Sequence, residues 1–406
     1  MRFADVWIPY GAYWVSPFAA WQGSFAGLQP IPFAADLARR ALAERGIDPA
    51  GIDGMCLGTT VPTRRSFYGA PWFAGLAGLG HLTGPTINQA CATSARCLMQ
   101  AAEELGSGGA TVYLAATADR TSNGPHLYYP EPGGPGGTGA SEDWVLDNFG
   151  LDPYAGNSML DTAENVAREA GIGRRAQEEL TLLRYRQYQQ ALAGDGAFHS
   201  RYMVRPVEVR DGRGRKVLGV VTGDEGIHPT TAEGLAGLRP LVEGGTVTHG
   251  TQTHPADGNA ALVLVAGRER ARALARDARV EVRLMSAGQA RVERGFMPKA
   301  VVPAARLALA QAGIGAADLT SVTTHLPFAV NDLFLARELD LDLERMNRHG
   351  CSLVWGHPQG PTGMRAVIEL IEDLVLQGGG YGLFTGCAAG DSAAAIVLRV
   401  GGPPAS

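Results

Sequence analysis

Two stretches far apart in the chain repeat one local pattern, and this duplication restricts the possible folds more than any other feature. Residues 41–55 read ALAERGIDPAGIDGM and residues 308–322 read ALAQAGIGAADLTSV, at a constant offset of 267 positions. Each stretch predicts a helix, a turn and then a strand. Further along each half, TVYLAA at 111–116 and GYGLFT at 380–385 follow glycine-containing turns and predict another strand. A repeat unit of half a chain predicts two related α/β halves with stacked layers of helices and sheet.

The segment between the two halves differs from both of them. Residues 130–140, PEPGGPGGTGA, predict a long surface loop, whereas residues 161–170 and 177–193 keep the periodicity of helices. We therefore interpret this segment as an insertion that can cover or line a site. The predicted division is 1–120 and 245–268 for the N-terminal half, 121–244 for an inserted loop domain, and 269–406 for the C-terminal half.

Composition excludes several classes of protein. The net charge of -5 gives no electrostatic case for binding nucleic acid or an anionic membrane surface. No apolar run approaches the roughly 18 residues of a membrane span, and the N-terminus lacks the layout of a secretory signal. The cysteines are odd in number and contain no C-x-x-C pair, so neither a disulfide framework nor a metal site is expected. A reduced, cytoplasmic enzyme is the default expectation. The five cysteines are at positions 56, 91, 97, 351 and 387.

Cys91 stands at the start of a predicted helix. Cys91, Ala95, Leu98, Ala102 and Leu105 recur at steps of four and three, which is one stripe of an α-helix. The unpaired backbone N–H groups and the dipole of a helix N-terminus favour negative charge, so we expect a lowered thiol pKa and a nucleophilic Cys91. The alternative is a small apolar residue that caps a core stripe.

Three further reactive side chains follow predicted strands or sit in glycine-rich turns. His325 lies in TTHLPFA (323–329), His357 in WGHPQGPTGMR (355–365), and Cys387 in GCAAGD (386–391). In open α/β sheets, functional groups gather beyond the carboxyl ends of strands. Two cysteines and two histidines suit acyl transfer through a covalent thioester. Taken singly, each residue is as easily explained as a turn residue or a core filler.

Taken together, these segments resemble the signatures of the thiolase family, within the thiolase and ketoacyl synthase superfamily. GHPQGPTGMR resembles the thiolase signature G-H-P-x-G-x-(S/T)-G-x-R, and YGLFTGCAAG resembles Y-G-L-x-T-x-C-I-G-G. NQACATS at 88–94 resembles the nucleophile segment N-x-x-C-x-S/T-(G/S). SMLDTAENVA at 158–167 resembles M-G-x-T-A-E-N-V-A, and residues 245–261 resemble G-T-V-T-A-G-N-A-S-x-x-N-D-G-A-A. The likeness covers nearly the whole chain.

The resemblance carries expectations about fold and activity. It implies a duplicated α/β thiolase fold with five layers in the order α-β-α-β-α and an inserted loop domain. It implies an acetyl-CoA C-acyltransferase-like enzyme of fatty acid metabolism that makes or thiolytically cleaves 3-ketoacyl-CoA by Claisen chemistry. Acyl-CoA thioesters would be its substrates, without a cofactor or metal. A homodimer or homotetramer is expected, with neither nucleic acid nor membrane as a partner.

The resemblance also assigns roles to residues. Cys91 would be the acylated nucleophile, and His357 would deprotonate it and help to hold the enolate. Cys387 would remove the α-proton of the second acyl-CoA. Backbone N–H groups of Cys91 and Ala389 would form the oxyanion hole. Two positions would line the pocket for the CoA pantetheine, Met159 and Thr253, and the arginines of the long helix, 184 and 186, are candidates to meet the CoA nucleotide.

One departure from the family pattern bears directly on the chemistry. His325-Leu326-Pro327-Phe328 stands where thiolases carry N-E-A-F. A histidine can donate a hydrogen bond to an enolate oxygen, so we include His325 among the catalytic residues. Cys91, His325 and His357 together also resemble the Cys-His-His set of ketoacyl synthases, and sterol-carrier-type thiolases have H-D-x-F at this place.

Three alternatives therefore stay open. The first is a ketoacyl-synthase-like condensing enzyme that uses a carrier-bound or malonyl substrate. The second is a sterol-carrier-type thiolase-like retro-aldolase, which is a lyase. The third is a non-catalytic scaffold that needs a partner chain, against which the two cysteines and His357 argue.

Overall fold

The computed structural model describes residues 1–211 and 214–401, and in it one large mixed sheet runs through both halves of the chain. The strands of the N-terminal half are β1 (Arg2–Pro9), β2 (Tyr13–Val15), β3 (Ala19–Ala20), β4 (Gly54–Gly58), β5 (Thr86–Ile87), β6 (Val112–Arg120) and β11 (Ala256–Ala266). Those of the C-terminal half are β12 (Glu281–Arg291), β13 (Leu319–His325), β14 (Gly380–Ala388) and β15 (Ser392–Gly401). The sheet order is β13-β14-β15-β12-β1-β11-β6-β4-β5, and β2 and β3 pair with β11. The halves join where β1 pairs antiparallel with β12.

The repeat that the sequence predicts is present as repeated structure. The first stretch forms the end of α1 (Pro30–Glu44), a turn and β4, and the second forms the end of α10 (Val301–Ala312), a turn and β13. In each half, the strand of the repeat pairs in parallel with a strand later in the chain. These pairs are β4 with β6 and β13 with β14. The second pair of repeated stretches, residues 111–116 and 380–385, lies at the start of β6 and β14. The predicted duplication is therefore confirmed.

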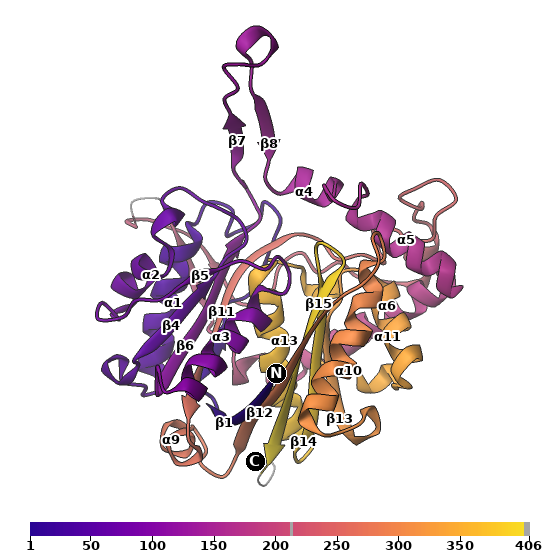
Figure 1. Cartoon of the computed structure of the whole chain (residues 1–406). Helices are drawn as coiled ribbons and strands as arrows, with labels where there is room; N and C mark the ends of the chain where they lie inside the picture. Colours follow the sequence, from indigo (N-terminus) through magenta and orange to yellow (C-terminus); the bar gives the residue numbers. More distant parts are fainter. Residues whose placement is uncertain (212–213, 402–406) are drawn as a thin grey trace.

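Helices lie in three layers around the two halves of the sheet (Figure 1). One outer layer holds α1, α2 (Gly69–Ala77) and α9 (Arg268–Leu274), and the other holds α10 and α11 (Ala329–Leu339). Between the half-sheets, α3 (Thr93–Ser107) packs against α13 (Gly360–Leu376). Neighbouring side chains of β6 alternate between two cores: Leu114 faces the outer helices, whereas Tyr113 and Ala115 face α3. The α-β-α-β-α order that the resemblance implied is confirmed.

The central helix α13 is buried around almost its whole circumference, because it lies between the two half-sheets. Its charged side chains must therefore find partners. Arg365 pairs with Asp224 at 2.7 Å, and Glu372 pairs with Arg201 at 2.6 Å. Asp224 and Arg201 both belong to the segment between β6 and β11. These ion pairs therefore hold this segment to the central helix α13.

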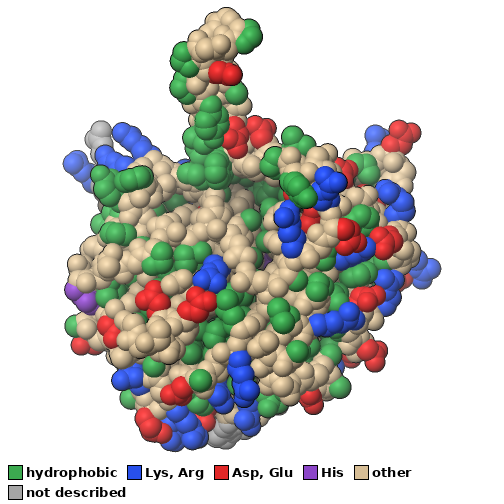
Figure 2. All heavy atoms as spheres, viewed as in Figure 1, with side chains coloured by type: hydrophobic (Ala, Val, Ile, Leu, Met, Phe, Trp, Pro, Cys, Tyr) green, Lys and Arg blue, Asp and Glu red, His purple; other side chains and the backbone are tan. Residues whose placement is uncertain are grey.

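The segment between β6 and β11 contains short strands and helices. The predicted surface loop forms the tip of a hairpin that projects from the body, with Tyr128 and Tyr129 exposed on one arm (Figures 1 and 2). Its two four-residue arms were not predicted, because so few residues give too little alternation. The elements are β7 (His126–Tyr129), β8 (Ala140–Asp143), α4 (Leu146–Gly150), α5 (Met159–Ala170), α6 (Arg174–Ala191), α7 (Ala193–Gly196), β9 (Val207–Arg210), β10 (Val217–Val221) and α8 (Ala232–Ala236). That 121–244 is a domain of its own stays a prediction.

The remaining regular elements are short. Helix α12 (Ser352–Trp355) precedes α13 in the chain. Single 3-10 turns lie at Pro49–Gly51, Ser66–Tyr68, Pro135–Gly137, His199–Arg201, Met297–Ala300, Ala316–Asp318 and Leu343–Arg345. Among the described residues, no helix has the length and apolar character to cross a membrane.

Candidate active site

One cavity of about 590 Å³ is lined by the residues that the sequence nominates for catalysis, the oxyanion hole and the pantetheine pocket. Its wall is largely apolar, with Trp144, Phe149, Met297 and Phe328 among the lining residues. Such a wall suits the arm and acyl group of a thioester substrate. The nominated residues that line the cavity are Cys91, Met159, Thr253, His325, His357, Cys387 and Ala389.

The duplicated fold brings these residues together. Cys91 lies two residues before the start of α3, and His357 lies three residues before the start of α13. Because α3 and α13 pack together in the central layer, their leading loops meet at one end of the molecule. His325 ends β13 and lies opposite Gly386 of the parallel neighbour β14, which places it beside Cys387 in the sheet.

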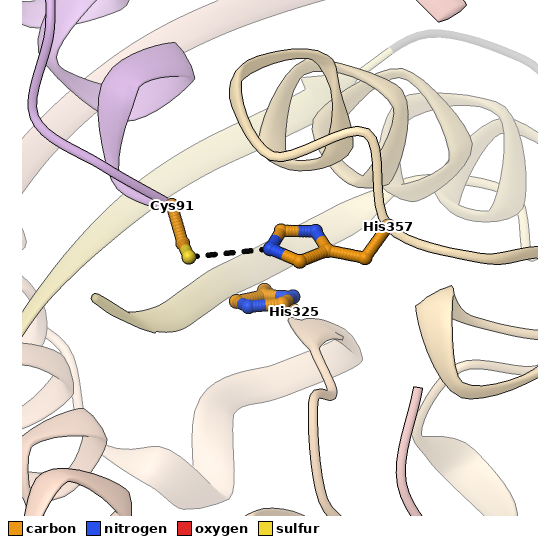
Figure 3. Close-up of side chains that lie close together, drawn as sticks. All are labelled: Cys91, His325 and His357. Atoms are coloured by element: carbon orange, nitrogen blue, oxygen red, sulfur yellow. Dashed lines mark hydrogen bonds between the residues drawn. The ribbon is translucent and has the colours of Figure 1, made fainter. Parts of the chain in front are cut away.

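Cys91 and His357 form a hydrogen-bonded pair (Figure 3). Cys91 Sγ lies 3.2 Å from His357 Nε2, and His357 Nδ1 lies 2.6 Å from Thr362 Oγ1. A neutral imidazole carries one ring proton. If the Cys91 thiol donates its proton to Nε2, the single ring proton of His357 sits on Nδ1 and is donated to the Thr362 hydroxyl. The Thr362 hydroxyl can accept this Nδ1 proton, so the contact orients the ring and is compatible with the tautomer in which His357 accepts a proton from Cys91.

The expected low pKa of the Cys91 thiol is wrong in direction. Burial raises its pKa to about 12, and this outweighs the lowering by the backbone N–H groups of Ala389 and of Cys91 itself. Burial, with smaller contributions from His325 and His254, holds the pKa of His357 well below its usual range. At neutral pH the pair is therefore a thiol and a neutral imidazole, an arrangement in which the imidazole can accept the thiol proton.

The same N–H groups have a second consequence. The backbone N–H groups of Ala389 and Cys91 both act on Cys91 Sγ. The carbonyl oxygen of an acyl group bonded to Sγ would lie beside these two backbone groups, which are donors of the kind that an oxyanion hole uses. The role assigned to these two groups stays a prediction that this placement supports.

His325 stacks on His357, with ring centroids 4.0 Å apart and an angle of 24° between the planes (Figure 3). Ser352 Oγ accepts a hydrogen bond from the Leu326 N–H at 2.9 Å, so its own proton can be donated to His325 Nδ1 at 3.3 Å. The His325 proton then sits on Nε2, which is buried and has no protein partner among the described residues. Burial lowers the pKa of His325 to about 3, so this ring is a neutral donor.

The two residues predicted to line the pantetheine pocket are held by different parts of the chain. Met159 is the first residue of α5. Thr253 donates its hydroxyl to the Ser352 carbonyl at 2.5 Å, and its N–H to the Pro327 carbonyl at 2.7 Å. Thr253 therefore fixes the turn that follows His325 as well as lining the cavity.

The expectation for the arginines of the long helix is wrong for Arg184. Its side chain is fully buried in an ion pair with Asp332 at 2.8 Å, so it cannot reach a nucleotide. Arg186 is exposed and pairs with Glu344 at 2.9 Å. The spacing of arginines on a helix shows which face they share, but the packing of that face was not visible in the sequence.

Sequence reasoning also missed three supporting residues. Thr362 lies within the GHPQGPTG stretch, where its spacing from His357 offered a signal. Ser352 and Asn331, which contacts Cys387, offered none. Their positions beside the site depend on how α11 and α12 pack against the ends of the strands.

The donor atoms of Cys91, His325 and His357 lie within 4.8 Å of one another, which is a donor set that Zn²⁺ accepts. The lone pair of a ring nitrogen lies in the ring plane. Because the two rings stack at 24°, their lone pairs do not converge on one point without rotation. The prediction of a site without metal therefore stays a prediction, and the stacking argues for it.

The chain matches two family models along most of its length: "Thiolase, N-terminal domain" over residues 13–268 and "Thiolase, C-terminal domain" over residues 278–400. It is 30% identical to an acetyl-CoA acetyltransferase of Pseudomonas aeruginosa over 385 residues, 93% of this chain and 95% of that protein. It is 32% identical to a 3-ketoacyl-CoA thiolase of Pseudoalteromonas translucida over 368 residues, 87% and 88% of the two chains. The crystal structure of the Bacillus anthracis acetyl-CoA acetyltransferase is similar, with a TM-score of 0.89, 27% identity and coverage of 98% and 99%.

Proposed function

The chain belongs to the thiolase family, and from this premise we propose that it is an acyltransferase that makes or thiolytically cleaves 3-ketoacyl-CoA through an acyl-S-Cys91 intermediate. The observation that carries the proposal is the Cys91–His357 pair, 3.2 Å apart at the wall of an apolar cavity. A thiol with a neutral imidazole within hydrogen-bonding reach is the arrangement of an activated nucleophile.

In the first step, His357 Nε2 takes the Cys91 proton as Sγ attacks the thioester carbonyl of an acyl-CoA. The new bond joins Sγ to the carbonyl carbon, the carbon–sulfur bond to CoA breaks, and CoA leaves with the proton. The backbone N–H groups of Cys91 and Ala389 hold the oxyanion. Their action on Cys91 Sγ supports this assignment.

In the second step, Cys387 takes the α-proton of a second acyl-CoA, and the resulting enolate attacks the acyl group on Cys91. A carbon–carbon bond forms, the bond to Cys91 Sγ breaks, and the proton on Cys387 passes to the released Cys91 thiolate, which leaves Cys387 as the thiolate for the next cycle. The unpartnered, buried Nε2–H of His325, with His357, is suited to hold the enolate oxygen. Thiolytic cleavage is this sequence in reverse.

The names of the relatives favour this reaction over the alternatives. An acetyl-CoA acetyltransferase and a 3-ketoacyl-CoA thiolase are aligned with more than four fifths of the chain. A malonyl-dependent condensing enzyme would release carbon dioxide, and a retro-aldolase would keep its activity in Cys91→Ser. The labelled malonyl-CoA control below tests the first, and an assay of Cys91→Ser on a β-hydroxyacyl-CoA tests the second.

We extend the proposal to substrates, assembly and compartment. Acyl-CoA thioesters are the substrates, and no further cofactor takes part. Homodimer or homotetramer formation rests on the resemblance, and sedimentation of the purified protein tests it. A cytoplasmic, reducing location is supported by the five cysteines, all within the described residues, which are free thiols.

The deciding experiment is intact-protein mass spectrometry after incubation with a panel of acyl-CoAs of different chain length. We expect a mass increase of one acyl group, mapped to Cys91, and none in Cys91→Ala, because only this thiol pairs with His357. The preferred chain length follows from the same panel. Labelled malonyl-CoA serves as the control for decarboxylation. A wild-type protein that takes up no acyl group from any donor would contradict the proposal.

A further inference from the structure

Cys387 has one side-chain hydrogen-bond partner that the thiolase signatures do not include. Asn331 Nδ2 donates to Cys387 Sγ at 3.2 Å, and both residues are 1% exposed. Asn331 Oδ1 is also buried and has no hydrogen-bond partner in the described part of the chain. A buried amide oxygen without a partner is costly, so it needs a reason.

The position of Asn331 follows from the fold. It is the third residue of α11, which starts four residues after His325, the last residue of β13. Helical side chains lean toward the helix N-terminus, so Asn331 reaches back toward the strand ends and the neighbouring β14, which carries Cys387. The adjacent Asp332 is held by Arg184 at 2.8 Å and by Asn347 at 2.9 Å. The first turn of α11 is thereby fixed on the side away from Cys387.

An amide offers what a sulfur that changes its protonation state requires. Its NH₂ group donates to a thiolate, and its oxygen accepts from a thiol, so a half-turn about the last side-chain bond matches either state. Burial raises the pKa of Cys387, a charge on Cys91 raises it further, and the Asn331 hydrogen bond acts in the opposite direction. Without this donor, the thiolate would be stabilised by its own backbone N–H alone among the described groups.

We propose that Asn331 is a positioning residue for Cys387, donating to its thiolate before the α-proton is taken and accepting from its thiol afterwards. This inference rests on the proposed function. The proton moves from the α-carbon of the second acyl-CoA to Cys387 Sγ, and the carbon–hydrogen bonding pair becomes the enolate. The unpaired Asn331 oxygen is the group that receives the new S–H.

The test compares Asn331→Leu, which has similar size and no donor, with Asn331→Asp, which replaces the donor by a negative charge. Val330→Ala is the matched control, because Val330 is the buried neighbour on the same helix and contacts neither catalytic thiol by hydrogen bond. All are made in a Cys91→Ser background, since Cys91 is the titratable group whose charge acts on Cys387. The rate of Cys387 alkylation by iodoacetamide is followed against pH by peptide mapping.

We expect the alkylation profile to shift to higher pH in Asn331→Leu and further in Asn331→Asp, because the thiolate loses its donor and then meets a carboxylate. Val330→Ala should lower the melting temperature without moving the profile. An unmoved profile in Asn331→Leu would overturn the inference. If that variant does not fold, Asn331→Asp, which keeps size and polarity, decides in the same way.

A second readout uses the chain with Cys91 intact and acetyl-CoA as the probe. In Asn331→Leu, acylation of Cys91 should stay within about two-fold of wild type, while condensation falls about 10-fold to 100-fold, as expected for one lost hydrogen bond to a charged group. Cys387→Ala gives the lowest expected rate of condensation, since this variant should be acylated but should not condense. Equal loss of both steps in Asn331→Leu would point to a structural role and overturn the inference. If wild-type protein is not acylated, the proposed function fails, and the alkylation profile still decides the role of Asn331.

Discussion

At the Cys91 thiol, burial and hydrogen bonding act in opposite directions, and burial prevails. In the reaction that we propose, His357 therefore makes the nucleophile at the moment of reaction, because Cys91 is not held as a thiolate. Proton transfer from Cys91 then depends on the orientation of the His357 imidazole. The Nδ1 contact to Thr362, at 2.6 Å, is the feature that fixes the orientation.

Replacing Thr362 by valine tests this dependence. Valine keeps the shape but removes the hydroxyl that is hydrogen-bonded to His357 Nδ1, which leaves a buried ring nitrogen unpaired at a cost of about 1–3 kcal/mol. We expect kcat/KM for acylation, measured as the burst of CoA release, to fall about 10-fold to 100-fold. Thr362→Ser keeps the hydroxyl and should stay near wild type. Wild-type acylation by Thr362→Val would mean that other contacts orient the ring.

At the scale of elements, the inserted helix α6 is joined to α11 by a buried ion pair. Arg184 and Asp332 are 0% and 1% exposed, and Asp332 also accepts hydrogen bonds from Thr324 and Asn347. This cluster fixes the end of β13, which bears His325, and the start of α11. Arg186, two positions further along α6, pairs with Glu344 of the 3-10 turn Leu343–Arg345; both side chains are more than half exposed, so this pair offers a comparison.

Removal of one member of each pair should give different losses of stability. Asp332→Ala leaves Arg184 charged and buried, so the free energy of unfolding should fall by about 3–5 kcal/mol. Glu344→Ala opens a solvated pair and should cost less than about 1 kcal/mol. Urea unfolding of both variants at pH 7 measures the difference. Equal losses would show that the Arg184–Asp332 pair does not hold α6 to α11.

At the scale of the whole molecule, buried neutral histidines set the response to acid. Burial lowers the pKa of His325 to about 3 and that of His199 to about 4, and it also lowers the pKa of His357. These groups take up protons in the unfolded chain below its histidine pKa of 6.5, but not in the folded chain. Their contribution to stability is therefore present above pH 6.5 and is lost as the pH falls toward the folded-state values.

The variant His325→Asn isolates one of these contributions. Between pH 7 and 5.5, each buried histidine should cost about 1 kcal/mol of unfolding free energy. We expect His325→Asn to lose about that much less than wild type over this interval, by urea unfolding at the two pH values. Asp119, whose pKa burial raises to about 6, acts in the opposite sense but is common to both proteins. Identical pH dependence of the two would contradict a neutral, buried His325.

The sequence by itself determined the duplicated plan, and it nominated the candidate reacting groups. The repeat around residues 41–55 and 308–322 predicts α1–β4 and α10–β13, because helical and strand periodicity are local properties of the chain. The motifs around Cys91, His357 and Cys387 pointed to one pocket, and all three line it.

Only the tertiary structure decided how those groups are tuned. The direction of the Cys91 pKa, the contact of Ser352 with His325, and the Asn331 contact to Cys387 all depend on burial and on partners brought in by packing. Arg184 and Arg186 share a helix, yet one is buried in an ion pair and the other is exposed. Desolvation and hydrogen-bond partnering are properties of position in three dimensions, so no local pattern of residues encodes them.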